Sequence, residues 1–260
     1  MIGLVAHHHV IAGDEPPARP VWLSPGHARR LDPLARLAAG AVDGALAGLT
    51  LPPDTALAVG TAYGSVVSTQ RLLDGIAADG DGLVSPAAFS ASVLSHVAGA
   101  LGEVLGLHGP VATISQGGTS ALAAVRWAWL QLAAGRASTA LVIAADHHSP
   151  WTTRVVEGLV TSRWRVSGGA SAWVLRRDAG RELRLGLHPA DVVVDGGAPD
   201  PRDEELLITT VAGRSRRCVP EVLGRWYPTA VLAALPADGP LQLLECEHRR
   251  LVAVWLGAPK

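Results

Sequence analysis

Apolar positions along the chain form two alternating kinds of pattern. Continuous apolar runs at residues 55–61 and 140–146 are typical of strands buried on both faces of a sheet. Apolar residues at helical spacing predict helices at residues 27–49 and 64–77. Their inward faces should carry Leu31, Leu34, Leu37, Ala38 and Ala41 on the first helix and Val66, Leu72, Leu73 and Ile76 on the second. This alternation of strands and helices predicts an α/β fold.

Shorter segments extend the pattern toward both ends. We predict a strand at residues 2–11, and a helix that follows residues 86–93 and ends near residue 105. Residues 164–176 should form a hairpin-like strand pair around Gly168 and Gly169. Further predicted elements are strands at 183–187 and 191–195, a helix or strand at 204–210, a helix at 221–235 interrupted by Pro228, and a hairpin of residues 241–246 and 251–256. Because no clean linker divides these elements, we expect one domain spanning residues 1–260.

The stretch at residues 109–130 is central to the organisation of the chain. It predicts a strand at residues 111–115, a tight turn at Gly117 and Gly118, and an almost wholly apolar helix from Ser120 to Ala134. Thr119 or Ser120 should cap that helix. A strand, a tight turn and a buried helix N-terminus form the geometry in which many enzymes mount a nucleophile.

Composition narrows the class of protein. The 260 residues are 48% hydrophobic, which suffices for a sizeable core, and the formal net charge of −1 gives no reason to expect a nucleic-acid partner. Two cysteines, Cys218 and Cys246, are too few for a disulfide framework, so we expect a reduced, cytoplasmic protein. The chain start lacks signal-peptide features, and no apolar run reaches about 18 residues, so no membrane span is expected.

Histidines and acidic residues raise three metal or catalytic interpretations. His7, His8 and His9 invite a metal site, but strand alternation turns His8 away from the other two and no acidic cluster is nearby. The turn at residues 79–82 lacks the later ligands of a calcium loop and should be solvated. His147 and His148 follow a central strand, where we expect hydrogen-bonding residues on a loop. We therefore expect no metal and no cofactor.

Several motifs in order resemble the ketosynthase members of the thiolase superfamily. The resemblance covers roughly residues 29–178 and is weak beyond them. The motifs that carry it are the first helix at 29–36, residues 58–64, the Phe-Ser-Ala-Ser-Val run at 89–93, residues 98–100, Gly109-Pro110, Thr113-Ile114, residues 140–143 and the glycine-rich segment at 167–175. The resemblance implies a layered α/β/α/β/α fold, with a complete N-terminal half at 1–178 and a reduced C-terminal half at 179–260.

The sequence departs from that family at the residues of catalysis. In the family a Thr-Ala-Cys-Ser-Ser pattern precedes the helix, and a gapless match places Gly118 at the cysteine. The loop matching the family's His-Gly-Thr-Gly-Thr motif, residues 194–200, has no histidine, and the second catalytic histidine is not recognisable. Claisen condensation needs a thiolate and histidines that stabilise the enolate, so the chain should lack that activity.

The resemblance therefore implies a non-catalytic, chain length factor-like subunit of a type II polyketide or fatty-acid-like system, and aryl polyene systems pair such a subunit with a catalytic ketosynthase. Its expected partners are that ketosynthase and, through the complex, an acyl carrier protein. The strand at 111–115 should pair with its counterpart across a pseudo-two-fold axis. The residues expected at the pocket or interface are Phe89, Ser90, Ser92, Val111, Ala112, Thr113, Ile114, Ser115, Gln116 and Gly117.

Three alternatives stay open at the sequence level. Gln116, two residues before the gapless cysteine position, could support malonyl decarboxylation, or it could be a buried amide that bonds the turn. Ser115, Thr119 or Ser120 could serve an acyltransferase or hydrolase with His147 or His148, although Gly-x-Ser-x-Gly is absent. The chain could also be a purely structural subunit that does not line its partner's pocket.

Overall fold

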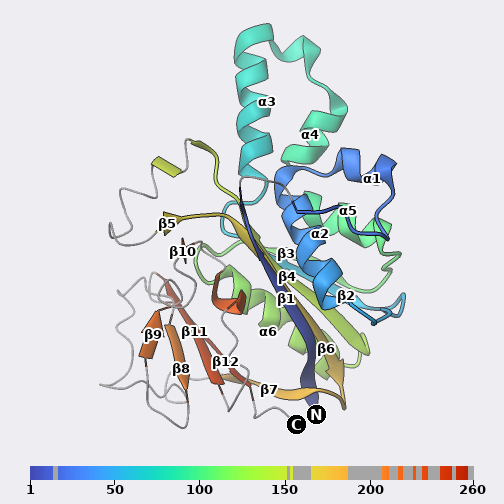
Figure 1. The fold of residues 1–260 in the computed structure, drawn as a ribbon, viewed down its shortest axis with the longest axis vertical. Coiled ribbons are helices and arrows are strands. Elements are labelled where there is room, and N and C mark those ends of the chain that lie inside the picture. The colour runs from blue at the N-terminus through green and yellow to red at the C-terminus, as the bar shows by residue number, and fades with distance from the viewer. Residues whose placement is uncertain are drawn as a thin grey trace.

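A ten-stranded sheet forms the centre of the computed structural model (Figure 1). The structure describes residues 1–13, 17–150, 153–154, 165–186, 207–210, 216–218, 225–226, 230–233, 241–247 and 250–256. Within these residues the strand order is β3-β2-β4-β6-β1-β7-β12-β11-β8-β9, with β3 at one edge. A separate parallel pair joins β5 (Arg165–Val166) to β10 (Arg225–Trp226). The predicted α/β class is confirmed.

Five strands build the first half of the sheet. They are β1 (Ile2–Ile11), β2 (Ala56–Gly60), β3 (Val111–Ile114), β4 (Thr139–Asp146) and β6 (Gly169–Arg177). β2 pairs in parallel with both β3 and β4, whereas β6 runs antiparallel to β4 and to β1. Every residue of β2 and β4 is buried, as the continuous apolar runs predicted. The carboxyl ends of β2, β3 and β4 therefore meet at one end of the sheet.

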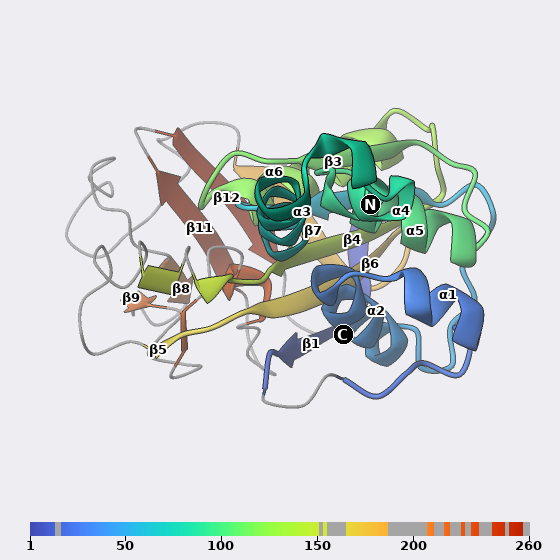
Figure 2. The ribbon, with the colours of Figure 1, turned by 90° about the horizontal axis from the view of Figure 1, so that it is seen from above.

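Helices cover both faces of this half. α2 (Pro33–Ala45) and α5 (His96–Val104) lie on one face, and α6 (Ser120–Ala133) packs on the other. Figure 2 shows α6 and α2 on opposite sides of β4 and β6. A 3₁₀ turn, η3 (Ala230–Ala233), joins the α6 face, where the buried Trp173 indole donates a hydrogen bond to the Leu232 carbonyl at 3.1 Å.

The predicted helix at residues 27–49 is wrong as a single element. The structure has α1 (Pro25–Arg30) and then α2, separated at Leu31 and Asp32. Proline disfavours helical conformation in the residue before it but suits the first helical position, so Pro33 ends one helix and begins the next. The Asp32 carboxylate caps α2 by accepting the Ala35 N–H at 2.7 Å.

Both of the next two predicted helices form, although the burial of the first and the segment between them differ from the prediction. α3 (Val66–Asp79) forms as expected, but it buries none of its residues, and Leu73 is 58% exposed. The segment after it divides into η1 (Asp81–Leu83), α4 (Pro86–Ser92) and α5, with a break at residues 93–95. α3 and α4 pack against each other and extend beyond the end of the sheet (Figure 1). Their apolar periodicity reflects a pair of projecting helices instead of core packing.

The second half of the sheet follows through β7 (Arg181–Gly186), β8 (Leu207–Thr210), β9 (Arg216–Cys218), β11 (Leu241–Glu247) and β12 (Arg250–Leu256). The terminal hairpin is confirmed as the antiparallel pair β11–β12, and residues 207–210 form a strand. The predicted strand pair at 164–176 is wrong, because β5 pairs with β10 while β6 lies between β4 and β1. Residues 225–226 are extended, so the predicted helix at 221–235 is also wrong there. The predicted strand at 191–195 lies outside the described residues.

No single helix among the described residues is long and apolar enough to cross a membrane. Only α4 and α5 taken together pass on length and composition, and they are bent by 104° at the break between them.

Candidate functional site

The strand–turn–helix predicted at residues 109–134 is present. β3 ends at Ile114, α6 begins at Ser120, and Gly117 adopts a positive φ of 60° in the turn between them. A side chain on Gly60 would collide with the Ser120 carbonyl, so glycine there allows the first turn of α6 to lie directly against the end of β2. Gly118, which the sequence comparison predicts to stand at the cysteine position, lies in this turn two residues before α6.

Hydroxyl groups close the turn on itself. The Ser120 hydroxyl accepts the Gln116 N–H at 2.8 Å and donates to the Gly117 carbonyl at 2.6 Å, while the Thr119 hydroxyl donates to the Gln116 carbonyl at 2.9 Å. Thr119 occupies the N-cap position of α6, but no side chain caps the helix N–H groups, so the predicted cap is wrong. Both hydroxyls bond backward into the turn.

These contacts bear on the proposed serine or threonine nucleophile. The Ser115 hydroxyl donates to the Ala62 carbonyl at 3.3 Å, and neither it nor the hydroxyls of Thr119 and Ser120 bonds to a histidine in the described part of the chain. No nucleophile–base pair of the kind that acyl transfer requires is assembled there. Gln116 is exposed, so the interpretation of its side chain as a buried amide is wrong, and its backbone alone bonds the turn.

A buried carboxylate joins the ends of the parallel strands. Asp146, the last residue of β4, is fully buried, and its Oδ1 accepts the Thr61 hydroxyl at 2.9 Å and the N–H groups of Ala62 at 2.9 Å and Tyr63 at 3.2 Å. The Thr61 hydroxyl in turn accepts the Gly64 N–H at 2.9 Å. These bonds fix the loop that leads from β2 toward α3.

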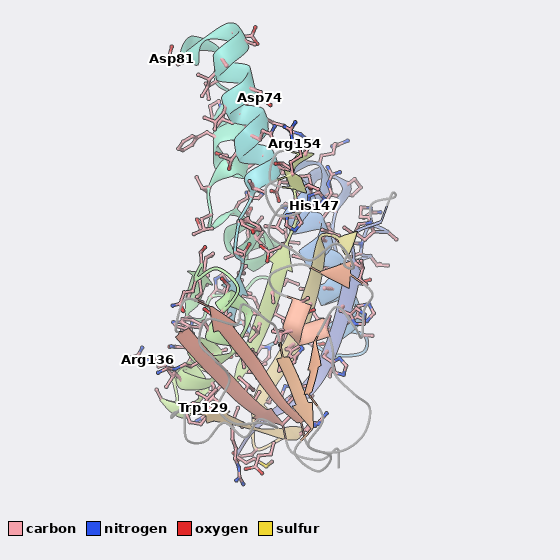
Figure 3. The ribbon with its side chains drawn as sticks, turned by 90° about the vertical axis from the view of Figure 1, so that its left-hand side faces the viewer. Asp74, Asp81, Trp129, Arg136, His147 and Arg154 are labelled. Carbon is pink, nitrogen blue, oxygen red and sulfur yellow. The ribbon has the colours of Figure 1, made fainter. Side chains whose placement is uncertain are left out.

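The two histidines after β4 lie beside this carboxylate, and Figure 3 shows His147 between the sheet and the projecting helix α3, which carries Asp74. Burial lowers the pKa of His147, whose Nδ1 donates to the His148 carbonyl at 3.1 Å. Burial, followed by the charge of His147, lowers the pKa of His148 to about 4. The His148 ring meets the Tyr63 ring edge-on, with 5.5 Å between centroids. Both histidines are therefore neutral near pH 7, and the prediction of hydrogen-bonding loop residues is confirmed for His147.

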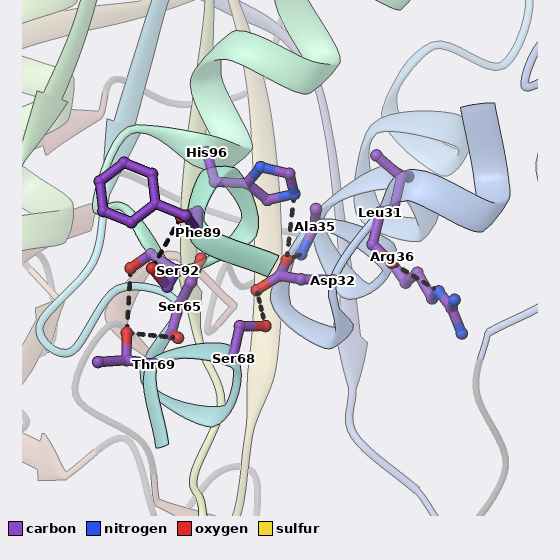
Figure 4. Close-up of polar contacts among 10 residues, drawn as sticks. All are labelled: Leu31, Asp32, Ala35, Arg36, Ser65, Ser68, Thr69, Phe89, Ser92 and His96. Carbon is purple, nitrogen blue, oxygen red and sulfur yellow. Dashed lines mark hydrogen bonds and ion pairs between the residues drawn. The ribbon is translucent and has the colours of Figure 1, made fainter. Parts of the chain in front are cut away.

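A second carboxylate anchors the projecting helix α3 (Figure 4). The Asp32 Oδ2 accepts the Ser68 hydroxyl of α3 at 3.3 Å, and Oδ1, which caps α2, lies 4.0 Å from Nε2 of His96 on α5. Asp32 is buried, so it connects three helices at one point. Neither role was predicted from the sequence, because Asp32 fell inside the single helix expected at 27–49 and Asp146 was treated only as the last residue of a strand.

Residues of the projection contact one another through the backbone. The Thr69 hydroxyl of α3 donates to the Ser92 carbonyl at 3.0 Å, and the Ser92 hydroxyl donates to the Phe89 carbonyl at 2.8 Å (Figure 4). Phe89 is 58% exposed, and Ser90 is exposed beside it. The predicted interface residues on this segment therefore lie at the surface of the free chain.

Large apolar side chains are exposed on the projection, on the loops beside it and on the edge strand. We call this set the apolar rim: Tyr63, Leu73, Phe89, Leu94 and Val111. Leu94 lies against Gly64, and the Ser115–Ala62 bond connects the loop after β2 to the end of β3. Of β3 itself, Val111 is 50% exposed and Ala112, Thr113 and Ile114 are half-buried. Among the described residues β3 pairs on one side only, and an edge of this kind presents backbone groups that another strand can bond.

The triple histidine forms no metal site among the described residues, which contain no group of three or more His, Cys, Asp or Glu residues able to hold a metal ion. His7, His8 and His9 are exposed on β1, and the His8 ring lies against Gly44 of α2.

The fold and this strand-end geometry define a thiolase-like α/β protein. The family model of the beta-ketoacyl synthase N-terminal domain matches residues 12–162, well over half of the chain. The chain therefore belongs to the β-ketoacyl synthase N-terminal domain family. No curated protein matches its sequence.

Solved structures with the same fold include assemblies of ketosynthases. One is a ketosynthase in complex with its chain length factor (ApeO and ApeC) from Xenorhabdus doucetiae, with 16% identity, a TM-score of 0.58 and 98% of both chains covered. Another is the ishigamide ketosynthase/chain length factor, with 18% identity, a TM-score of 0.62, and 92% of this chain and 84% of that chain covered. A third is AntDE:AntF, a type II acyl-carrier protein in complex with its ketosynthase, with 16% identity, a TM-score of 0.55, and 71% and 69% covered. At these identities the likeness shows the fold.

Proposed function

We propose that the chain is a non-catalytic, chain length factor-like subunit that pairs with a cysteine-bearing ketosynthase and shapes its acyl pocket. The pair would act in type II polyketide or related biosynthesis, receiving its substrates from an acyl carrier protein. The Phe-Ser-Ala-Ser-Val run at 89–93 favours a polyene product, such as an aryl polyene. In this proposal residues 1–260 form one thiolase-like domain, with residues 1–178 as the complete half and 179–260 as the shortened half.

The observation that carries the proposal is an intact nucleophile turn with no nucleophile in it. β3, the Gly117 turn and α6 are all in place, yet Gly118 stands where the family has its cysteine. The nearby hydroxyls of Thr119 and Ser120 are engaged by backbone groups of the same turn. Without a thiolate to hold the acyl chain, condensation would have to occur on another subunit.

The surface around that turn supports a protein partner. The apolar rim lies beside an edge strand whose free backbone groups can extend a neighbouring sheet. A monomer rarely leaves so many large apolar side chains exposed near an unpaired edge. Pairing of β3 with the matching strand of a ketosynthase would cover Val111 and place the exposed Gln116 at the partner's pocket.

Co-expression with a cysteine-bearing ketosynthase encoded beside it tests this proposal. We expect a stable heterodimer by light scattering, and chain elongation from malonyl carrier protein only when both subunits are present. The Gln116→Ala variant should leave the heterodimer intact and change the distribution of product lengths. Elongation or malonyl decarboxylation by the purified chain alone would contradict the non-catalytic assignment, and a monomer in every mixture would contradict the pairing.

A further inference from the structure

A cavity of about 340 Å³ lies on the α2 side of the molecule, away from β3 and from the turn before α6. The segment at residues 17–25 and the helices α1 and α2 line it, and its mouth is open to solvent. Its walls are mainly apolar, formed by prolines of that segment together with Leu23, Ala28 and Ala39. The cavity is within the size range of small-molecule sites, which is roughly 300–1,000 Å³. Nothing in the proposed pairing uses this cavity.

Three arginines line the cavity, one from each enclosing element. They are Arg19 of the segment, Arg29 of α1 and Arg36 of α2. No Asp or Glu is among the described lining residues, and in the described part of the chain none of the three guanidinium groups forms an ion pair. Guanidinium groups stay charged at any pH that a protein tolerates. Three like charges around one apolar cavity create a positive potential that an anion would relieve.

Two of these side chains are held in place by backbone carbonyls. Arg19 donates through Nη1 to the Leu23 carbonyl, and Arg36 donates through Nε to the Leu31 carbonyl at 3.1 Å. Figure 4 shows the Arg36 side chain directed away from the Asp32 cluster, so that carboxylate does not neutralise it. Each guanidinium keeps N–H groups beyond the one bonded, and a forked set of such donors matches the oxygens of phosphate or carboxylate.

We propose that this cavity binds a small organic oxyanion, with a phosphate or carboxylate head at the arginines and an apolar body against the prolines, Leu23, Ala28 and Ala39. The arginine charges favour a ligand with a phosphate or carboxylate group. The apolar walls favour a ligand with an apolar body over an inorganic anion. This site is separate from the ketosynthase pairing and does not depend on it.

Calorimetric titration of the full-length chain with phenyl phosphate, benzoate, inorganic phosphate and benzyl alcohol tests the proposal. Phenyl phosphate or benzoate should bind at least about tenfold more tightly than inorganic phosphate, because the ring buries apolar surface. Benzyl alcohol should not bind measurably. Whichever of the two aromatic anions binds more tightly identifies the head group.

Single variants separate the cavity from general charge. Arg29→Gln removes a guanidinium with no bonded partner among the described residues, so the fold should be unaffected, and it should weaken binding by about fivefold or more. Arg36→Gln should also weaken binding by about fivefold or more. Arg126 is an exposed arginine on α6, and Arg126→Gln should leave binding unchanged. The proposal is overturned if Arg29→Gln and Arg36→Gln bind the aromatic anions as tightly as the wild-type chain does. It is also overturned if the wild-type chain shows no preference for the aromatic anions over inorganic phosphate.

Discussion

Thr61 and Asp146, 85 residues apart in the sequence, are joined by a 2.9 Å hydrogen bond at the carboxyl ends of β2 and β4. The same carboxylate oxygen receives the N–H groups of Ala62 and Tyr63. One buried acidic side chain therefore fixes the loop on which Tyr63 faces His148 and Leu94 faces Gly64. The position of the projecting helices relative to the sheet depends on this loop.

Replacing Asp146 tests that dependence. Asp146→Ala leaves three donors without their acceptor in a buried place, and we expect a loss of unfolding free energy of about 3 kcal/mol or more. Asp146→Asn keeps an acceptor oxygen and should lose less. Urea denaturation measures both, with Asp74→Asn on the exposed surface of α3 as a control that changes little. Equal stability of the alanine variant and the wild type would show that the bonds contribute nothing.

Gly44 is required by the His8 ring. A Cβ at Gly44 would overlap that ring, so Gly44→Ala should destabilise the chain by roughly 1–3 kcal/mol. The double variant with His8→Ala should recover that loss, because the space is freed and alanine favours the helix. Gly75→Ala in α3, where nothing lies within 4 Å, is the matched control and should stabilise by about 0.5–1 kcal/mol. Additive effects of His8→Ala and Gly44→Ala in denaturation would refute the contact.

His148 should make stability fall in mild acid. Its pKa is lowered to about 4 in the folded chain, below the ordinary value of 6.5 that applies on unfolding. Between these values the unfolded chain binds a proton that the folded chain does not, so stability is lost as the pH falls from about 6.5 toward 4 and is unaffected above that window. His148→Asn should flatten the slope, and His108→Asn, at an exposed position, should not. Identical slopes from denaturation at several pH values would exclude His148 as a source.

Charge on the edge strand should prevent pairing. Val111→Asp or Thr113→Asp would place a carboxylate where a partner sheet is proposed to meet β3, and we expect at least about a tenfold loss of affinity for the ketosynthase. Val21→Asp, at a side chain 96% exposed away from β3, controls for added charge. Bulk at Ala91 of α4 should impair association or change product length. Unchanged co-purification and products for all these variants would remove β3 and α4 from the interface.

Restoring the thiol alone should not restore condensation. Gly118→Cys places a nucleophile in the turn, but the loop at 194–200 still offers no histidine to promote decarboxylation or to stabilise an enolate. We expect no chain elongation by the purified variant with malonyl carrier protein, followed by mass spectrometry of the carrier. Elongated product in the absence of a ketosynthase would show that another group supplies the missing catalysis.

The sequence predicts strands better than helix limits in this chain. The continuous apolar runs at β2 and β4 are buried on both faces, and this signal has one simple interpretation. The prediction of one helix at 27–49 is wrong because the apolar residues keep helical spacing on both sides of Pro33. The proline that divides the helix is visible in the sequence, but the prediction followed the apolar spacing. For α3 the predicted helix is correct but its predicted burial is not. Apolar residues at helical spacing indicate an apolar face, and they do not show whether that face lies in the core or at the surface.

The candidate site was predictable only as a backbone shape. The turn at Gly117 and Gly118 follows from glycine and the flanking apolar pattern. The hydrogen bonds that Thr119 and Ser120 form with the backbone of Gln116 could not be predicted in the same way. A hydroxyl beside the start of a helix can either cap the helix or close the preceding turn. Asp146 likewise acts on residues 61–63, a long-range contact that local sequence does not encode.

The position of β1 has a consequence for synthesis. This first strand pairs with β6 through Ile2 and Arg177, and with β7 through Gly3 and Glu182. During translation β1 therefore cannot pair in the sheet until residues 169–177 of β6 have been made. This pairing joins segments that are distant in the sequence, and such non-local contacts slow folding.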